Sequence, residues 1–171
     1  MTSRILAVDV LLEPDERMLE QAERNNARLR EVFPDGFALD EAHRPHITLL
    51  QCFAAEENLT QLCEVTAAAI RAAAIADLQL QADRCYFAPG PGAGVAGICS
   101  PLTAELESVQ SAVIAAARPF IVPTATIDAF TEGHGNADFD AALIRYVETF
   151  IAQQAGAHFN PHVSTGIAPT A

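Results

Sequence analysis

Two short stretches far apart in the chain share one pattern of side chains that can do acid–base chemistry. The first reads PHIT at 45–48 and the second reads PHVS at 161–164. Side chains alternate between the two faces of a β-strand, so the histidine and the hydroxyl residue of each stretch project to the same side. The aliphatic residue between them projects into apolar packing on the other side. The candidate site residues are therefore His46, Thr48, His162 and Ser164.

Two imidazoles and two hydroxyls suit the cleavage of a phosphodiester. Imidazole titrates near neutral pH, so a pair can hold one neutral ring as general base and one protonated ring as general acid. Neutral hydroxyls donate hydrogen bonds to the non-bridging oxygens of a phosphate, which orients it and stabilises charge in the transition state. Such a set needs no metal and no cofactor. Which histidine is the base and which is the acid stays open.

Chance recurrence is the alternative explanation, because a histidine followed two residues later by serine or threonine is a weak pattern by itself. Both stretches, however, begin with a proline. The order of the elements expected around them also matches. These two further agreements favour one shared site.

Hydrophobic periodicity predicts alternating strands and helices. The expected strands cover 4–12, 44–53, 78–88, 93–99, 119–130 and 159–168. The expected helices cover 13–33, 56–74, 100–118, with Ser100 and Pro101 as its cap, and 137–154. The buried stripe of the first helix is expected to be Met18, Ala22, Asn25, Leu29 and Val32. The order strand, helix, motif-bearing strand thus occurs twice, in the first and in the last third of the chain.

The glycine-rich stretch GPGAG at 90–94 is interpreted as a turn between two strands. It lacks the GK[ST] ending of a phosphate-binding loop and does not open directly onto a helix. A mobile lid is the other interpretation, and the sequence does not separate the two.

The twin motif resembles that of the 2H phosphoesterase superfamily, which includes the 2′-5′ RNA ligases and the 2′,3′-cyclic nucleotide phosphodiesterases. The motif of that family, His-hydrophobic-[Thr/Ser]-hydrophobic, stands here as HITL and, approximately, as HVST. The similarity extends to the longer stretches HRPHITLLQ and FNPHVS and to the order of elements. The second motif departs from the pattern at Thr165, where the family has a hydrophobic residue.

The resemblance implies a fold and roles for the four residues. It implies an α+β fold with a two-lobed, pseudo-twofold arrangement of antiparallel sheets that face a central cleft, with helices outside. Residues 1–171 would then form a single domain of two lobes, with one histidine from each. By the same similarity, His46 and His162 would be general acid and base, and Thr48 and Ser164 would orient the phosphate.

Residues near the motifs supply further candidates. Arg44 could contact a phosphate through its guanidinium, although pairing with one of the many acidic residues is the alternative. Tyr86 could stack on a base, ahead of Phe53 and Phe159, and core packing is the alternative for each. His43 and His158 precede the motifs but lack the spacing of metal ligands, so we expect no metal. We expect no role for His134, which lies in a loop.

Composition limits the partners. The chain has 171 residues, a net charge of −12 and 50% hydrophobic residues, so we expect a packed protein that does not bind a long nucleic acid duplex. No apolar run is long enough to span a membrane. The absence of a visible signal peptide favours the cytoplasm, although a removed leader stays open. We expect a monomer, with its four cysteines reduced and in the core.

These observations together predict a metal-independent phosphodiesterase that acts on a 2′,3′-cyclic phosphate or a 2′-5′ linkage of a nucleotide or an RNA end. Ligation is less favoured, because a chain this acidic is poorly suited to bind large RNA. The alternatives are a non-catalytic module that binds a nucleotide phosphate and a metal-dependent hydrolase. The substrate, its base and the direction of the reaction in the cell stay open.

Overall fold

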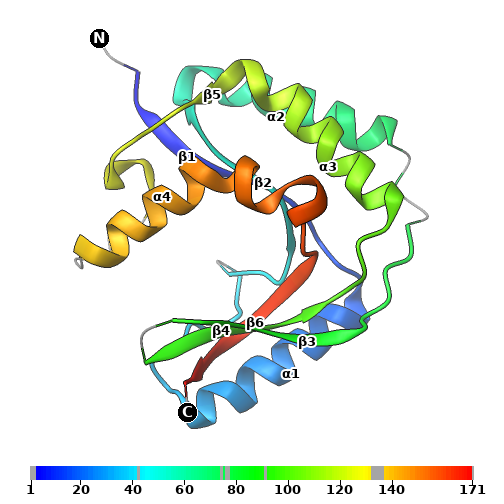
Figure 1. Cartoon of the computed structure of the whole chain (residues 1–171), viewed down its shortest axis with the longest axis vertical. Coiled ribbons are helices and arrows are strands. Elements are labelled where there is room, and N and C mark those ends of the chain that lie inside the picture. Colours follow the sequence, from blue (N-terminus) through cyan, green and yellow to red (C-terminus); the bar gives the residue numbers. More distant parts are fainter. Residues whose placement is uncertain are drawn as a thin grey trace. The chain divides into compact units, whose positions relative to one another are not determined.

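The computed structural model of the chain describes residues 3–41, 43–73, 75, 78–90, 92–131 and 137–170. Within them lie four α-helices and two three-stranded antiparallel sheets, which confirms the expected α+β class (Figure 1). The helices are α1 (Glu16–Val32), α2 (Leu59–Ala72), α3 (Ala104–Ala117) and α4 (Ala137–Gln154). Short 3-10 turns cover Glu56–Asn58, Arg118–Phe120, Ile127–Ala129 and Gly156–His158.

The two sheets differ in the order of their strands. The first has the order β1-β2-β5 and consists of β1 (Ile5–Leu12), β2 (Ile47–Ala55) and β5 (Ile121–Val122). The second has the order β3-β4-β6 and consists of β3 (Arg84–Pro89), β4 (Ala93–Cys99) and β6 (His162–Pro169). The two strand–helix–strand stretches are therefore not equivalent, because β1 and β2 share a sheet whereas β5 and β6 do not.

Several expected boundaries were wrong for identifiable reasons. The strand expected at 119–130 shrinks to the two residues of β5, because Pro119 and Pro123 flank it and proline has no N–H for a strand ladder. The strand expected from residue 78 begins only at Arg84. Thr103, not Ser100, caps α3, and its hydroxyl accepts a hydrogen bond of 3.2 Å from the Leu106 N–H.

The chain divides into two compact units, each built from three separate segments. The first unit comprises Met1–Val10, Leu49–Leu78 and Thr103–Phe159. The second unit comprises Leu11–Thr48, Gln79–Leu102 and Asn160–Ala171. That the whole chain forms a single domain of two lobes stays a prediction.

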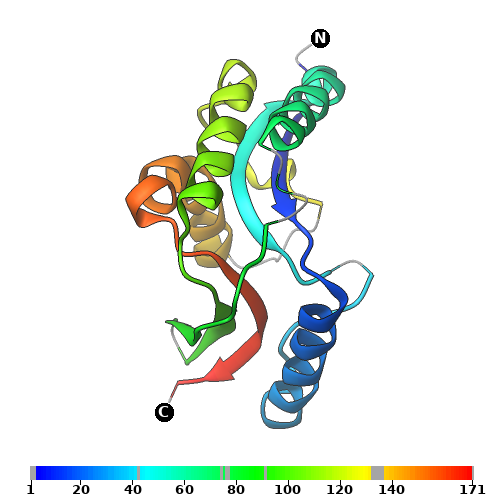
Figure 2. The same cartoon turned by 90° about the vertical axis from the view of Figure 1, so that its right-hand side faces the viewer.

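The core of the first unit forms between its sheet and its helices. Helix α2 packs against α3, and Figure 2 shows β2 as a long curved strand beside β1. Phe53 is only 1% exposed and lies in a buried cluster with Ala129 and Val147. The Gln110 side chain is fully buried and bonds to three backbone groups, of Leu49, Gln154 and Gly156.

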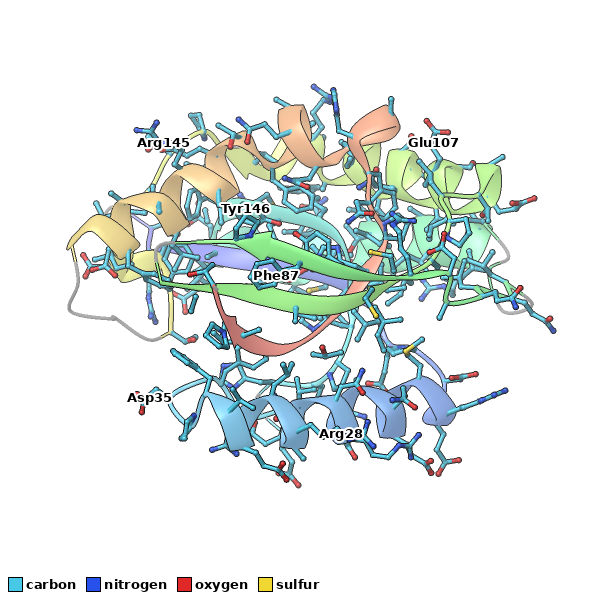
Figure 3. All side chains as sticks on the ribbon, turned by 60° about the horizontal axis from the view of Figure 1, so that its bottom comes forward. Arg28, Asp35, Phe87, Glu107, Arg145 and Tyr146 are labelled. Carbon is cyan, nitrogen blue, oxygen red and sulfur yellow. The ribbon has the colours of Figure 1, made fainter. Side chains whose placement is uncertain are left out.

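In the second unit, α1 packs along β6 and covers one face of the β3-β4-β6 sheet (Figure 3). Asp15 caps α1 through a 2.9 Å hydrogen bond from the Met18 N–H. The stripe predicted for this helix is confirmed at Ala22, which is fully buried, but Asn26 rather than Asn25 is buried and Val32 is 68% exposed. Gly166 allows the close approach of helix and strand, since a Cβ there would lie 3.0 Å from the Leu29 side chain.

Two further expectations concern the cysteines and the membrane. All four cysteines are free; Cys52 and Cys99 are buried, but Cys63 and Cys85 are exposed, so the core placement was wrong for two of them. Among the described residues, none of the helices combines the length and the apolar character that crossing a bilayer requires.

Candidate active site

The second motif lies on the face of the β3-β4-β6 sheet that is turned away from α1, and this face is called the open face below. Strand register aligns Ser164 with Gly97 and Tyr86, and Val163 with Ile98. Val163 is 2% exposed, whereas His162 and Ser164 are half-buried. A Cβ at Gly166, on the same face as Val163, would point at α1. His162 and Ser164 therefore project together on the face turned away from α1, as their spacing predicts.

A second row of side chains lies beside the first on this face. Register aligns His162 with Cys99 and Arg84, because directly opposed residues of antiparallel strands point to the same side. Burial raises the pKa of the Cys99 thiol, so it stays protonated next to the histidine. The open face thus carries one imidazole, one hydroxyl, one phenol and one guanidinium within three strands.

A β-bulge explains the departure of the second motif at Thr165. Ala96 pairs with Gly166 while the next residue, Gly97, pairs with Ser164, so Thr165 is the extra residue of β6. Thr165 is 3% exposed, and its hydroxyl donates to the carbonyl of Ala96 at 3.2 Å. A polar residue is stable at this position because the bulge provides an acceptor for its hydroxyl.

Only glycine fits opposite the bulge, at position 97. A Cβ at this position would lie 2.6 Å from the Val163 carbonyl oxygen and 3.4 Å from the Ser164 Cα, both of them backbone atoms. The centre of the open face therefore carries no side chain between Tyr86 and Ser164.

Both histidines are held by the same local geometry. His46 Nδ1 lies 2.7 Å from the Arg44 carbonyl oxygen, and His162 Nδ1 lies 2.7 Å from the Asn160 carbonyl oxygen. Each bond spans a buried proline. A carbonyl oxygen only accepts, so the proton of each neutral ring is on Nδ1 and the lone pair is on Nε2. Nε2 is therefore the nitrogen at which either ring would exchange a proton.

The first motif begins just before a strand rather than inside one. Strand β2 starts at Ile47, which is 6% exposed, while His46 and Thr48 on either side of it are half-buried. The expected alternation of faces is therefore present here as well. All four motif residues fall in the second unit, although β2 continues into the first.

Arg44 pairs with an acidic residue, which was the alternative to a phosphate contact. Its Nη2 donates to Glu13 Oε1 at 2.9 Å, and both side chains are largely exposed. An exposed pair of this kind is weak, so it fixes the guanidinium only loosely. Phe53 and Phe159 are 1% and 7% exposed, which places both in the core rather than against a ligand.

The ring of Tyr86 contacts His162, one of the two candidate catalytic histidines. Its ring centroid lies 4.5 Å from that of His162, with 32° between the two planes. Burial raises the pKa of the Tyr86 phenol, so the ring stays neutral. The sequence suggested Tyr86 only as a contact for a base.

Arg84 is a residue of the open face that the sequence did not single out. Its Nη2 donates to Asn160 Oδ1 at 2.6 Å, and Nη1 pairs with Asp83 at 3.0 Å. The Asn160 carbonyl is the group that holds His162. Arg84 and Tyr86 both lie in the strand expected at 78–88, so the alternation of side chains along that strand could have placed them on one face.

The remaining histidines lie outside this arrangement. His43 Nδ1 is 3.7 Å from Asp40 Oδ1, and its ring stacks on Phe37 with 6.2 Å between centroids. His158 is exposed in a 3-10 turn of the first unit. Residue 134 lies outside the described residues. In the part of the chain that the structure describes, no three His, Cys, Asp or Glu side chains gather as a metal site would need.

The candidate site therefore consists of two imidazoles, which can exchange a proton at Nε2, and two half-buried hydroxyls. Such groups can bind an anion and transfer protons to or from it. The open face around His162 adds an arginine and a tyrosine. No protein-family model, no curated protein and no solved structure matches this chain.

Proposed function

We propose that the protein is a metal-independent phosphodiesterase of the 2H type, acting on a 2′,3′-cyclic phosphate or a 2′-5′ linkage of a small nucleotide or an RNA end. The single observation that carries the proposal is the shared geometry of the two histidines. Each donates Nδ1–H across a proline to the carbonyl two residues earlier, at 2.7 Å in both cases. Two imidazole rings with the same hydrogen bond and the same tautomer support a paired role better than two unrelated surface histidines would.

The proposed reaction uses Nε2 of both rings. One neutral ring removes a proton from water, and the oxygen of that water forms a new bond to phosphorus. The bond from phosphorus to one ribose oxygen breaks, and the other ring, protonated on Nε2, gives its proton to that oxygen. For a 2′-5′ linkage the attacking group is the neighbouring ribose hydroxyl, and the products are a cyclic phosphate and a free 5′-hydroxyl.

Thr48 and Ser164 have the supporting role in this proposal. Each lies two residues after its histidine on the same face of its strand, and both are half-buried. Their hydroxyls would donate to the non-bridging oxygens, where negative charge builds up in the transition state. A phosphate held between the two motifs requires them to lie close together, and their membership of one compact unit supports this.

The expected fold detail belongs to the same proposal. We infer that the sheets of the protein face a central cleft around a pseudo-twofold axis, with β2 and β6 as the motif-bearing strands. The membership of these two strands in different sheets is compatible with it.

Turnover in the presence of a chelator tests the function. The substrates are the four 2′,3′-cyclic nucleotides and a set of 2′-5′ dinucleotides, followed by phosphorus NMR in excess EDTA. His46→Asn and His162→Asn are the informative variants, because the asparagine amide can replace the Nδ1 donor but not Nε2. General acid–base catalysis contributes about 10²- to 10⁴-fold, so each variant should lose activity by that factor.

His158→Asn is the matched control, because His158 is exposed and belongs to the first unit. It should retain wild-type turnover. Full activity in both motif variants would refute the proposal, and loss of wild-type activity in EDTA would indicate a metal-dependent hydrolase instead. Saturable binding of a nucleotide without product would indicate the binding module.

A further inference from the structure

The ring of Tyr86 occupies a position from which it can restrain His162. The two ring centroids are 4.5 Å apart and their planes differ by 32°, an offset arrangement of the kind that aromatic pairs prefer. Tyr86 lies on β3 and His162 on β6, with β4 between them. The contact therefore crosses the whole width of the sheet.

Gly97 makes this contact geometrically accessible. It lies between Tyr86 and Ser164 in the register, and it has no side chain over which the tyrosine ring would have to pass. A Cβ there would also clash with the Val163 carbonyl oxygen at 2.6 Å. The tyrosine ring is thus free to lean diagonally from its own row toward the row of His162.

The imidazole is restrained from two directions as a result. Its Nδ1 donates to the Asn160 carbonyl oxygen at 2.7 Å, which fixes one edge of the ring. Arg84 holds the side chain of the same asparagine at 2.6 Å. Tyr86 covers one face of the ring. A hydrogen bond at one edge and an aromatic ring on one face leave Nε2 with little freedom of direction.

We propose that Tyr86 is a positioning residue for His162, which keeps Nε2 aimed at the reacting phosphate, and that it does not serve as the stacking surface for the nucleobase. The inference rests on the proposed function as far as turnover is concerned. Burial raises the pKa of Tyr86, so the phenol stays neutral and places no negative charge against His162. Among the described contacts, the phenol oxygen has no hydrogen-bond partner, so the ring rather than the hydroxyl provides the support.

Three variants on β3 separate the possibilities. Tyr86→Leu removes the aromatic ring, and Tyr86→Phe removes only the hydroxyl. Phe87→Leu is the matched control, because Phe87 is the next residue on the same strand, points to the other face and is 45% exposed. Turnover of a 2′,3′-cyclic nucleotide gives kcat and KM for each variant.

Misplacement of a reacting group by about 1 Å can cost about 100-fold in rate, so Tyr86→Leu should lower kcat by about 10- to 100-fold. KM should change by less than about threefold, since ground-state binding would not depend on the ring. Tyr86→Phe and Phe87→Leu should keep wild-type kcat. Proton and carbon NMR of the His162 ring in the free protein gives a readout without substrate: the Cε1–H resonance should move in Tyr86→Leu and stay in Phe87→Leu.

The NMR readout separates failure of this inference from failure of the proposed function. No turnover by the wild type, with the His162 resonance moved only in Tyr86→Leu, would remove the proposed reaction but leave the contact between the two rings in place. A raised KM with unchanged kcat and an unmoved resonance in Tyr86→Leu would overturn the inference and make Tyr86 a substrate contact. Equal loss in Tyr86→Phe would also overturn it, since the hydroxyl would then be the acting group.

Discussion

Replacement of Asn26 by leucine should destabilise the second unit, because this side chain connects three backbone groups. The Nδ2 group donates to the carbonyl oxygens of Phe37 at 3.0 Å and Thr165 at 3.1 Å. The Oδ1 atom accepts from the Leu39 N–H at 3.1 Å. The residue is 5% exposed, so water does not readily replace what it provides. A leucine of similar volume removes all three hydrogen bonds at once.

The size of the effect follows from which groups can reach water. Phe37 and Leu39 lie in a half-buried segment and can become hydrated, so each lost bond costs about 1 kcal/mol. Thr165 is 3% exposed, and its unpaired carbonyl costs about 2 kcal/mol. The apolar leucine offsets about 1 kcal/mol, which leaves a net loss of about 3 kcal/mol in the free energy of unfolding. For a chain of this size, that corresponds to a Tm lower by roughly 6–12 °C.

Urea denaturation followed by circular dichroism measures this loss. The matched control is Asn25→Leu, since Asn25 is half-buried and its Oδ1 accepts from Gln21, at 2.9 Å within the same helix. The control should change the free energy of unfolding by less than about 0.5 kcal/mol. If Asn26→Leu costs no more than Asn25→Leu, the connecting role of Asn26 is wrong.

Two further perturbations test the site and the core. Gly97→Ala should lower the Tm and the turnover together, because its Cβ would lie 2.6 Å from the Val163 carbonyl oxygen and backbone must move; a variant with wild-type Tm would contradict the register given for β4 and β6. Burial, with the charge of Asp9, raises the pKa of the Cys52 thiol to about 11. The folded pKa is thus above the unfolded one, so stability should be complete below pH 9 and fall as the pH rises toward 11. Denaturation at several pH values measures this fall, which should be smaller in Cys52→Ala.

Local sequence patterns predicted much of the fold. Helix α4 covers Ala137–Gln154, as expected from its periodicity, and β1 and α1 were placed to within a few residues. The prediction of a strand at 119–130 was wrong because it relied on the apolar residues of this stretch and neglected the effect of its two prolines. The periodicity of α1 predicts Asn25 rather than Asn26 in the buried stripe, because adjacent residues of the same type differ by only one step around the helix. Burial in such cases depends on which partner packs there.

In the candidate site, too, local sequence patterns predicted some features, whereas contacts between distant strands could not be predicted. Each histidine and the hydroxyl residue two positions later project to the same face, because side chains alternate along a strand. This was predicted for both motifs. The contact of Tyr86 with His162 depends on the register of three strands and on the bulge at Thr165, which a single sequence does not specify. The hydrogen bonds from Nδ1 depend on the path of the backbone through each proline.

The central claim is that His46 and His162 act on one phosphate, and a titration observed at both rings tests it most directly. The protein is labelled with ¹⁵N-histidine, its resonances are assigned with His46→Asn and His162→Asn, and adenosine 2′-monophosphate, a product of the proposed reaction, is added in EDTA. We predict that the Nε2 resonances of both rings move along one saturation curve with one Kd. Movement of only one ring, or two curves with different Kd values, would contradict a single site formed by both histidines.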